Sequence, residues 1–479
     1  MRRVSGYLTV YLTLCLTLIV SLYLVLIDSA RYKGAALEAI CAAETGLSSV
    51  MGEYHRELFR QFGLFGIDCS YGTASCRINH TEEHLLDYVD RNLDVSDVFL
   101  ASFLYRDFFD LNVRDVEIDQ VSLFSDGGGA VFRGAAIDAV SDDIGLGLLE
   151  SVMDWADTIT VNGLDRQNSE ADMTRANAVL DDLNGTEVQI SEQETGCVDV
   201  ANPVGNVFTL KKKGILNLVT DVSTLSEKRI NTAAYIQSRL QKGMVSRGNM
   251  AIDERDGLTD RFLFQEFLLR NLGHFGQTKE QTALSYQLEY LLAGADSDVE
   301  NLRKVAGRLC AIREAANAAY LWSDPQKKAE ITLAATVACG IFLLPELIPA
   351  VTTLILLGWA YMESIYDVKS LLEGGKVPLW KDASTWHYGL SSACGGELPG
   401  TQISRVGLSY EDYLRVLLML TGLEKLTLRA MDMVEADIRL TPGNQFFRLD
   451  GCVAQFRANV RIDSGFGYGF EIIRQKGYE

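Results

Sequence analysis

The sequence predicts an α+β protein in which an N-terminal transmembrane helix continues into a long stem helix. The stem carries a helix-rich extracytoplasmic head with a small antiparallel C-terminal sheet. Three observations lead to this class. An uncharged apolar run occupies positions 7–27, and amphipathic helical spacing recurs between residues 226 and 440. After residue 441 the apolar side chains recur at every second position, which is typical of strands.

The apolar run at 7–27 has the length of a membrane span. A helix of its 21 residues is about 31 Å long, close to the ~30 Å hydrocarbon thickness of a bilayer. A cleavable signal peptide has a shorter apolar core of about 7–15 residues, and the residues after Ile27 form a poor cleavage site. We therefore expect a basic leader at 1–6 and a retained anchor at 7–27.

Charges on either side of the run favour one orientation. The charged residues nearest the run are Arg2, Arg3, Asp28, Arg31 and Lys33. Because positive charge tends to stay on the cytoplasmic side, the bias favours a cytoplasmic amino terminus. We expect a single-pass protein of the cell membrane that contacts the lipid bilayer through residues 7–27, with its head outside the cytoplasm.

Residues 28–62 are predicted to continue the anchor as the stem helix. The segment is alanine-rich and lacks proline, and its apolar positions keep helical spacing: Leu37, Ile40, Cys41, Leu47, Val50 and Met51. Glycine-rich turns end the pattern from Gly63 onward. The region 63–225 is predicted as mixed α/β: residues 114–124 alternate like a strand, whereas residues 141–205 are acidic and weakly periodic and suggest an exposed insertion.

Residues 226–330 form a predicted helical region, with candidate helices at 226–244 and 260–272. Its strongest helix begins at a capping box made by Ser297 and Glu300, and Pro325 bars its continuation. A second helical region covers 367–440, where Ser409 and Asp412 form another capping box.

Between these regions lies an apolar segment, 331–366, that predicts a helical hairpin. Pro345, Glu346 and Pro349 divide it into arms of about 14 and 17 residues, each short for a span. A lipid-exposed Glu346 would cost about 2.5–3.5 kcal/mol. A hairpin that is buried in the head or docked on the membrane is therefore favoured over one or two true spans. The C-terminal strands, 441–479, are expected to pair with residues 114–124.

Charge and cysteine content narrow the function classes. The chain has 44 basic and 64 acidic side chains and a net charge of −20, which argues against nucleic acid as a partner. Cys69 and Cys76 flank a glycine-containing loop and could form a local disulfide in an oxidising space, although free buried thiols fit the sequence as well. Aromatic residues near the C-terminus, Phe466, Tyr468 and Phe470, are expected to pack within strands.

One short motif suggests chemistry. The stretch 80–84, HTEEH, fits the HxxEH pattern in which two histidines bind zinc and the glutamate acts as a base. His80, Glu83 and His84 would then make a membrane-anchored zinc hydrolase, a metallopeptidase. The same residues also fit a surface helix start capped by Asn79 or Thr81. We favour the second interpretation, and with it a non-enzymatic protein without a cofactor or a metal site.

Several stretches together resemble a known group of membrane proteins. The anchor, which begins GYLTVYLTL and closes IDSARYKGAALEA, resembles TadE/TadG-like pseudopilins of tight-adherence (Flp-type) pilus loci. Blocks such as GEYHRELFRQFGLFGID, IREAANAAYLWSDPQKKAE and FRLDGCVAQFRANV resemble an uncharacterised clostridial membrane-anchored protein family found near such loci. The resemblance implies no enzyme activity. It implies a pseudopilin-like or accessory component of a pilus or secretion apparatus, with other pilus or pseudopilin subunits as partners.

The same resemblance implies prepilin-type processing between Gly6 and Tyr7. Type IV prepilins carry a glutamate at the fifth position of the mature helix, and cleavage after Gly6 would put Tyr11 there. The absence of an acidic side chain between Gly6 and Asp28 favours a minor, anchored component over a major pilin.

Overall fold

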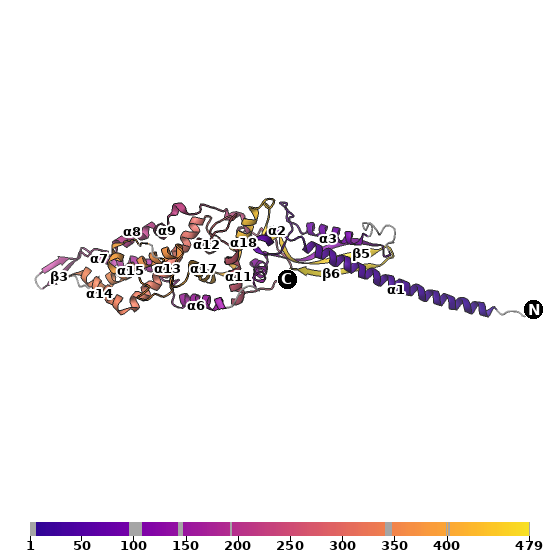
Figure 1. The fold of residues 1–479 in the computed structure, drawn as a ribbon, viewed down its shortest axis with the longest axis horizontal. Coiled ribbons are helices and arrows are strands. Elements are labelled where there is room, and N and C mark those ends of the chain that lie inside the picture. Colours follow the sequence, from indigo (N-terminus) through magenta and orange to yellow (C-terminus); the bar gives the residue numbers. More distant parts are fainter. Residues whose placement is uncertain are drawn as a thin grey trace, which may run out of the picture. The chain divides into compact units, whose positions relative to one another are not determined.

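The computed structural model describes residues 6–94, 108–141, 147–191, 194–340, 347–398, 400 and 403–478 (Figure 1). The chain divides into two compact units. Unit 1 comprises Met1–Asp138, Lys242–Glu254 and Thr441–Glu479, and unit 2 comprises Ala139–Gln241 and Arg255–Leu440. A long N-terminal apolar helix, a helix-rich body and a small antiparallel sheet near the C-terminus confirm the predicted α+β class.

Unit 1 combines one very long helix with a four-stranded sheet. Its elements are α1 (Tyr7–Met51), α2 (Arg56–Phe62), β1 (Ile67–Asp68), α3 (Ile78–Leu93), β2 (Leu111–Leu123), α5 (Asp126–Asp138), η3 (Leu449–Gly451), β5 (Cys452–Ser464) and β6 (Gly469–Gly477). β5 is the central strand: β2 pairs with one edge, and β1 and β6 pair with the other, all antiparallel. Val116 lies opposite Val460, so the predicted pairing of 114–124 with the C-terminal strands is confirmed.

The second half of α1 packs closely because its buried face is made of small side chains. That face consists of Ala35, Ala39, Ala42, Ala43, Gly46, Leu47 and Val50. A Cβ atom on Gly46 would lie 2.6 Å from the Val89 side chain, so only glycine permits this distance between α1 and α3. The small face, α3 and the sheet share one apolar core that includes Leu85, Phe456 and Val460.

Unit 2 is built around α15, which packs against α13, α14, α7, α9, α16 and α8. Its helices are α6 (Gly147–Val161), α7 (Ser169–Leu183), α8 (Gly205–Lys213), α9 (Ile215–Val219), α10 (Ile236–Gln241), α11 (Leu258–Asn271), α12 (Gln287–Ala293), α13 (Asp298–Ser323), α14 (Pro325–Cys339), α15 (Leu347–Leu372), α16 (Leu390–Gly395), α17 (Tyr410–Met419) and α18 (Leu423–Arg439). Two short 3₁₀ turns, η1 (Val222–Thr224) and η2 (Thr232–Ala234), and a β3 (Glu187–Ser191)–β4 (Glu194–Cys197) hairpin complete it.

Several helix starts follow their predicted caps. The Ser297 hydroxyl accepts a hydrogen bond from the Glu300 backbone N–H, and Ser409 and Asp412 form a complete capping box at α17. Pro325 ends α13 as expected, and it then occupies the first turn of α14, where a missing N–H costs nothing.

Three local expectations were wrong. The stem helix ends at Met51, not near residue 62, because the His55 side chain caps a separate helix, α2, by accepting from Leu58 N. The expected insertion at 141–205 contains α6 and α7, which bury sparse apolar positions such as Val152, Met173 and Leu180. The candidate helix at 226–244 is helical only over α10 and the η2 turn, where the Asn231 side chain caps the turn instead.

Candidate membrane anchor and its base

The first half of α1 is an apolar rod on which none of the other described elements packs. Over the most apolar window of α1, mean hydropathy is 2.5 and no side chain is buried within the chain. In Figure 1 this part of α1 extends beyond α3 and the strands of unit 1. Thr9, Thr13 and Thr17 each donate a hydroxyl hydrogen bond to a backbone carbonyl one turn earlier, which satisfies their polar groups inside the rod.

The second half of α1 is held along its length by β6, which runs in the same direction. Glu44 lies 2.6 Å from the Arg474 side chain and 2.9 Å from Lys476 Nζ. The hydrogen bond from Lys476 lowers the pKa of Glu44. At the end of the stem, the Tyr478 hydroxyl donates to the Met51 carbonyl at 2.6 Å. Strand β6 and the residue that follows it therefore hold the second half of α1 in place.

The base of unit 1 is the place where the β5–β6 turn meets α1 just after the apolar run. The Tyr32 ring lies 5.4 Å from the Tyr468 ring and 5.5 Å from the Phe470 ring, centre to centre. The Arg31 guanidinium sits 4.0 Å above the Phe466 ring, and the Tyr468 hydroxyl donates to the Asp28 carboxylate. Tyr468 and Phe470 thus pack on the stem rather than only within strands.

The HxxEH residues lie on α3, beside the end of the stem. His84 Nδ1 is 2.9 Å from the Glu53 carboxylate, which also accepts hydrogen bonds from the hydroxyls of Tyr71 and Tyr88 at 2.8 Å. Burial, together with the hydrogen bond to Glu53, raises the pKa of the Tyr71 hydroxyl. The structure therefore uses His84 to tie α3 to the segment that follows α1.

The other two residues of the motif, His80 and Glu83, are too far apart for a hydrogen bond. His80 Nδ1 lies 4.0 Å from the Glu83 carboxylate, and within the described ranges no three His, Cys, Asp or Glu side chains form a group that could hold a metal ion. The predicted cap at Asn79 or Thr81 was wrong, because α3 begins at Ile78 and its N-cap, Arg77, makes no side-chain capping bond.

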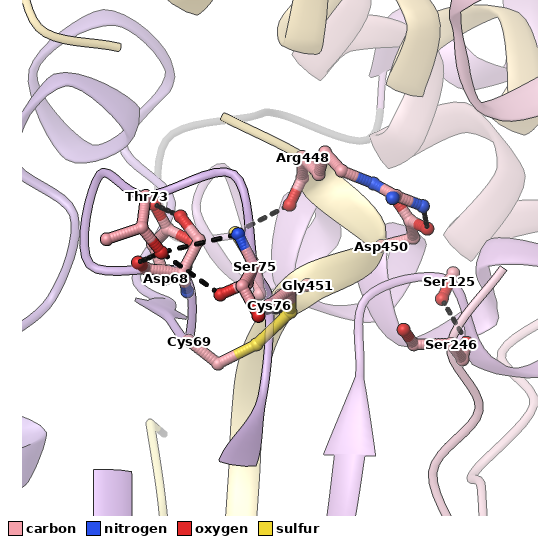
Figure 2. The surroundings of a disulfide bond; sticks show 12 residues. Asp68, Cys69, Thr73, Ser75, Cys76, Ser125, Ser246, Arg448, Asp450 and Gly451 are labelled. Carbon is pink, nitrogen blue, oxygen red and sulfur yellow. Dashed lines mark hydrogen bonds and ion pairs between the residues drawn. A yellow bond between two sulfur atoms is a disulfide. The ribbon is translucent and has the colours of Figure 1, made fainter. Parts of the chain in front are cut away.

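Cys69 and Cys76 are joined in a disulfide that closes the loop between β1 and α3 (Figure 2). Inside this loop the Asp68 carboxylate accepts hydrogen bonds from Ser70 N and Oγ at 2.9 and 2.8 Å. Gly451 passes beside the bond, where an added Cβ atom would lie 2.5 Å from Cys76 Sγ. A glycine is needed here because any side chain would displace the disulfide.

The second long apolar helix, α15, has a different environment. Its most apolar window has a mean hydropathy of 1.4, and 72% of that window is buried. Between Arg313 Nε and Asp367 Oδ2 the distance is 3.0 Å, and between Lys381 Nζ and Asp367 Oδ1 it is 2.6 Å. Lys381 also pairs with Glu363, one turn earlier on α15. Burial raises the pKa of Asp367, but Lys381 and Arg313 outweigh burial and lower it.

The expected hairpin at 331–366 corresponds to α14 and α15, which contact each other, although α15 continues to Leu372. Pro345 and Glu346, where the sequence predicts the turn of the hairpin, lie outside the described residues. The sequence left open whether this segment is buried, docked on the membrane or spanning. For α15 the structure shows the buried alternative, since unit 2 fully encloses the side chains of Leu347, Val351, Leu354 and Trp359. The close-packed ion pairs explain how a helix with two interior carboxylates remains buried.

A further group of buried acids lies where α18 meets α12 and α10. Asp432 accepts hydrogen bonds from Gln237 N at 3.1 Å and from the Tyr290 hydroxyl at 3.0 Å. Burial raises the pKa of Asp432 to about 7 and that of Asp437 to about 6. Glu435 is paired with a cation: the Arg239 guanidinium donates a hydrogen bond to each of its two carboxylate oxygens, at 2.8 and 2.6 Å. These acids are buried, and their hydrogen bonds and ion pair link α18 to α10 and α12.

Together, these features define a class: a helix-rich protein with an N-terminal helix that could span a membrane and a second apolar helix that is mostly buried. Residues 193–464 match a family of unknown function, DUF5702, and this range is more than half of the 479 residues. The chain belongs to that family. No curated protein and no solved structure matches the chain. The matched range ends with β5 and does not include α1.

Proposed function

We propose that the protein is a non-enzymatic, membrane-anchored surface protein, a pseudopilin-like or accessory component of a tight-adherence pilus or secretion apparatus. The observation that carries the proposal is the exposure of α1 residues 7–27, none of which is enclosed by the rest of the chain. The run holds 13 Leu, Ile and Val residues, and burying one such side chain is worth about 1.5–3 kcal/mol. A rod of this kind requires lipid or other apolar helices around it.

The division of α1 into two halves supports the pseudopilin-like part of the proposal. One half is free and apolar, and the other packs its alanine-rich face on an antiparallel sheet. This arrangement is the general plan of pilins and pseudopilins, and it agrees with the TadE/TadG-like resemblance of the anchor sequence. Because residues 7–27 contain no carboxylate to pair with a neighbour's terminal amine, a minor component fits better than a polymerising pilin.

Two observations support the placement of the head outside the cytoplasm. The basic residues of the leader precede the apolar run, which favours a cytoplasmic amino terminus. The Cys69–Cys76 disulfide suits an oxidising compartment. In this arrangement the negatively charged body supplies protein–protein contacts, while residues 7–27 pack laterally on the stems of other subunits.

The proposal is tested on the full chain in its native cells. Membranes are washed with alkaline carbonate, the retained protein is isolated, and its N-terminal peptide is identified by mass spectrometry. We expect retention in the membrane, a mature N-terminus at Tyr7, and cross-linking to other proteins that begin with an apolar helix. Recovery of the chain in the soluble fraction, cut after residue 27, would contradict the anchor. An anchored chain that is uncut and cross-links to no such protein would contradict the pilus assignment.

A further inference from the structure

We infer that an aromatic collar at the base of unit 1 rests on the membrane surface and contacts the boundary between lipid headgroups and hydrocarbon. The collar consists of Tyr32, Phe109, Phe466, Tyr468 and Phe470. This inference rests on the proposed anchoring through residues 7–27. It goes beyond that anchoring because it assigns a second lipid contact to residues outside the anchor, all of which except Tyr32 are far from it in sequence.

The position of the collar along α1 is the first observation. Its contacts to α1 fall between Asp28 and Gly34: Tyr468 meets Asp28, Phe466 meets Arg31, and the Phe109 ring lies 2.7 Å from where a Cβ on Gly34 would be. Those positions span about 9 Å of helix and begin directly after the apolar run. The headgroup layer on each side of a bilayer is about 5–8 Å thick. The collar therefore lies at the level of that layer.

Exposure is the second observation. Tyr32 and Phe466 are 48% and 46% exposed, although each is a large aromatic side chain. Tyr and Trp are enriched at the membrane–water interface, where an amphipathic ring is accommodated, and an exposed Phe ring gains free energy from contact with the adjacent hydrocarbon. A lipid interface would cover Tyr32 and Phe466 at once, because both lie at the level of Arg31 on the stem.

The turn between β5 and β6 is shaped to present Phe466. Gly465 N donates to the Asp110 carbonyl at 2.8 Å, and Gly467 adopts φ = 86°, a conformation that favours glycine. Phe466 sits between these glycines with the Arg31 guanidinium over its ring. Arg31 and Lys33 are offset by Asp28 and Asp110, so we expect the contact to form on uncharged phosphatidylcholine without anionic lipid.

The test uses three variants of the full chain, each with one added tryptophan. Each variant is reconstituted in phosphatidylcholine vesicles with or without brominated acyl chains. The native tryptophans, Trp155, Trp322, Trp359, Trp380 and Trp386, all lie in unit 2 and give a common background. Leu16→Trp probes the anchor and Phe466→Trp probes the collar. Ile473→Trp is the matched control, since Ile473 is 50% exposed and precedes Arg474, which binds Glu44, about 24 Å further along α1 than Asp28.

We expect strong quenching by brominated lipid at position 16, at least about half as much at position 466, and background quenching at position 473. Background quenching at 466 with strong quenching at 16 would overturn the collar and leave the anchor intact. Background quenching at 16 would overturn the proposed anchoring itself. If Phe466→Trp fails to fold, Tyr32→Trp takes its place, with the same expected result and the same contrary one.

Discussion

Helices α1 and α15 are both long and apolar enough to cross a membrane, yet they have opposite surroundings. No residue in the apolar window of α1 is buried, whereas 72% of the α15 window is buried by its neighbours in unit 2. The difference follows from charge. The run at 7–27 contains no charged residue, but α15 continues into Glu363 and Asp367, which require buried cations. Hydropathy alone therefore does not separate an exposed apolar helix from a core helix, while the position of ionisable residues does.

The largest expected effect comes from breaking the ion pairs of α15. Arg313 is fully buried and donates to Asp367, to the Leu379 carbonyl at 2.6 Å and to the Tyr413 hydroxyl at 3.2 Å. Arg313→Met leaves the carboxylates short of one cation, so we expect the free energy of unfolding to fall by about 3–5 kcal/mol. The measurement is urea denaturation of the full chain in detergent.

A matched control lies on the same helix, α13. Arg303 makes an exposed ion pair with Glu300, and such pairs contribute about 0–1 kcal/mol. Arg303→Met should therefore change stability little. If both variants lose the same amount, the buried ion pairs do not stabilise α15 as described.

The second effect concerns pH and the buried Asp432. Its pKa is about 7 in the folded chain and about 3.9 when unfolded, so between these values the folded chain binds the extra proton. This contribution to stability is complete below about pH 4 and is lost as the pH rises through 7. The free energy of unfolding of Asp432→Asn minus that of the unmodified chain should then rise by on the order of 4 kcal/mol between pH 4 and pH 8. The measurement is denaturation of both chains at each pH.

Glu424→Gln is the control for that measurement, because Glu424 is exposed on the same helix, α18. Glu424→Gln should change the free energy of unfolding little, because its side chain is exposed and makes few contacts. A difference for Asp432→Asn that is flat with pH would show that burial does not raise the pKa of this carboxyl.

The third effect is on the anchor. Leu16→Asp puts a carboxylate in the middle of the 7–27 run, at a cost of about 2.5–3.5 kcal/mol for insertion. We expect the fraction retained in alkaline-washed membranes to fall well below that of the unmodified chain. Leu37→Asp changes an equally exposed residue of α1 beyond the run and should leave retention unchanged. Equal retention of all three chains would argue that lipid does not surround residue 16.

The smallest effect concerns the close contact between α1 and α3. Gly46→Leu overpacks the site beside Val89, and we expect a loss of about 1–3 kcal/mol in the stability of unit 1. Gly134→Ala, on α5 of the same unit, has open space for its Cβ atom and should be neutral or slightly stabilising. Denaturation midpoints that rank the two variants in the reverse order would contradict the close packing of the stem.

Local patterns were enough to predict the apolar run, the helix caps at Ser297 and Ser409, and the strands at the C-terminus. They could not predict the base of unit 1, because Tyr468 meets Asp28 across 440 positions and no periodicity records such a contact. The helices α6 and α7 were missed since their buried positions are few and lie among acidic residues. In the HxxEH stretch, the spacing was correct for a metal site, but His84 binds Glu53 instead.

Hydrophobic photolabelling from within the bilayer tests most directly whether α1, and not α15, lies in lipid. The full chain is reconstituted in vesicles that carry a carbene-generating probe on the acyl chains, and labelled peptides are mapped by mass spectrometry. We expect label on residues 7–27 and none on residues 347–372. Label on the second segment, or its absence from the first, would contradict the central claim that one apolar helix is the anchor and the other is core.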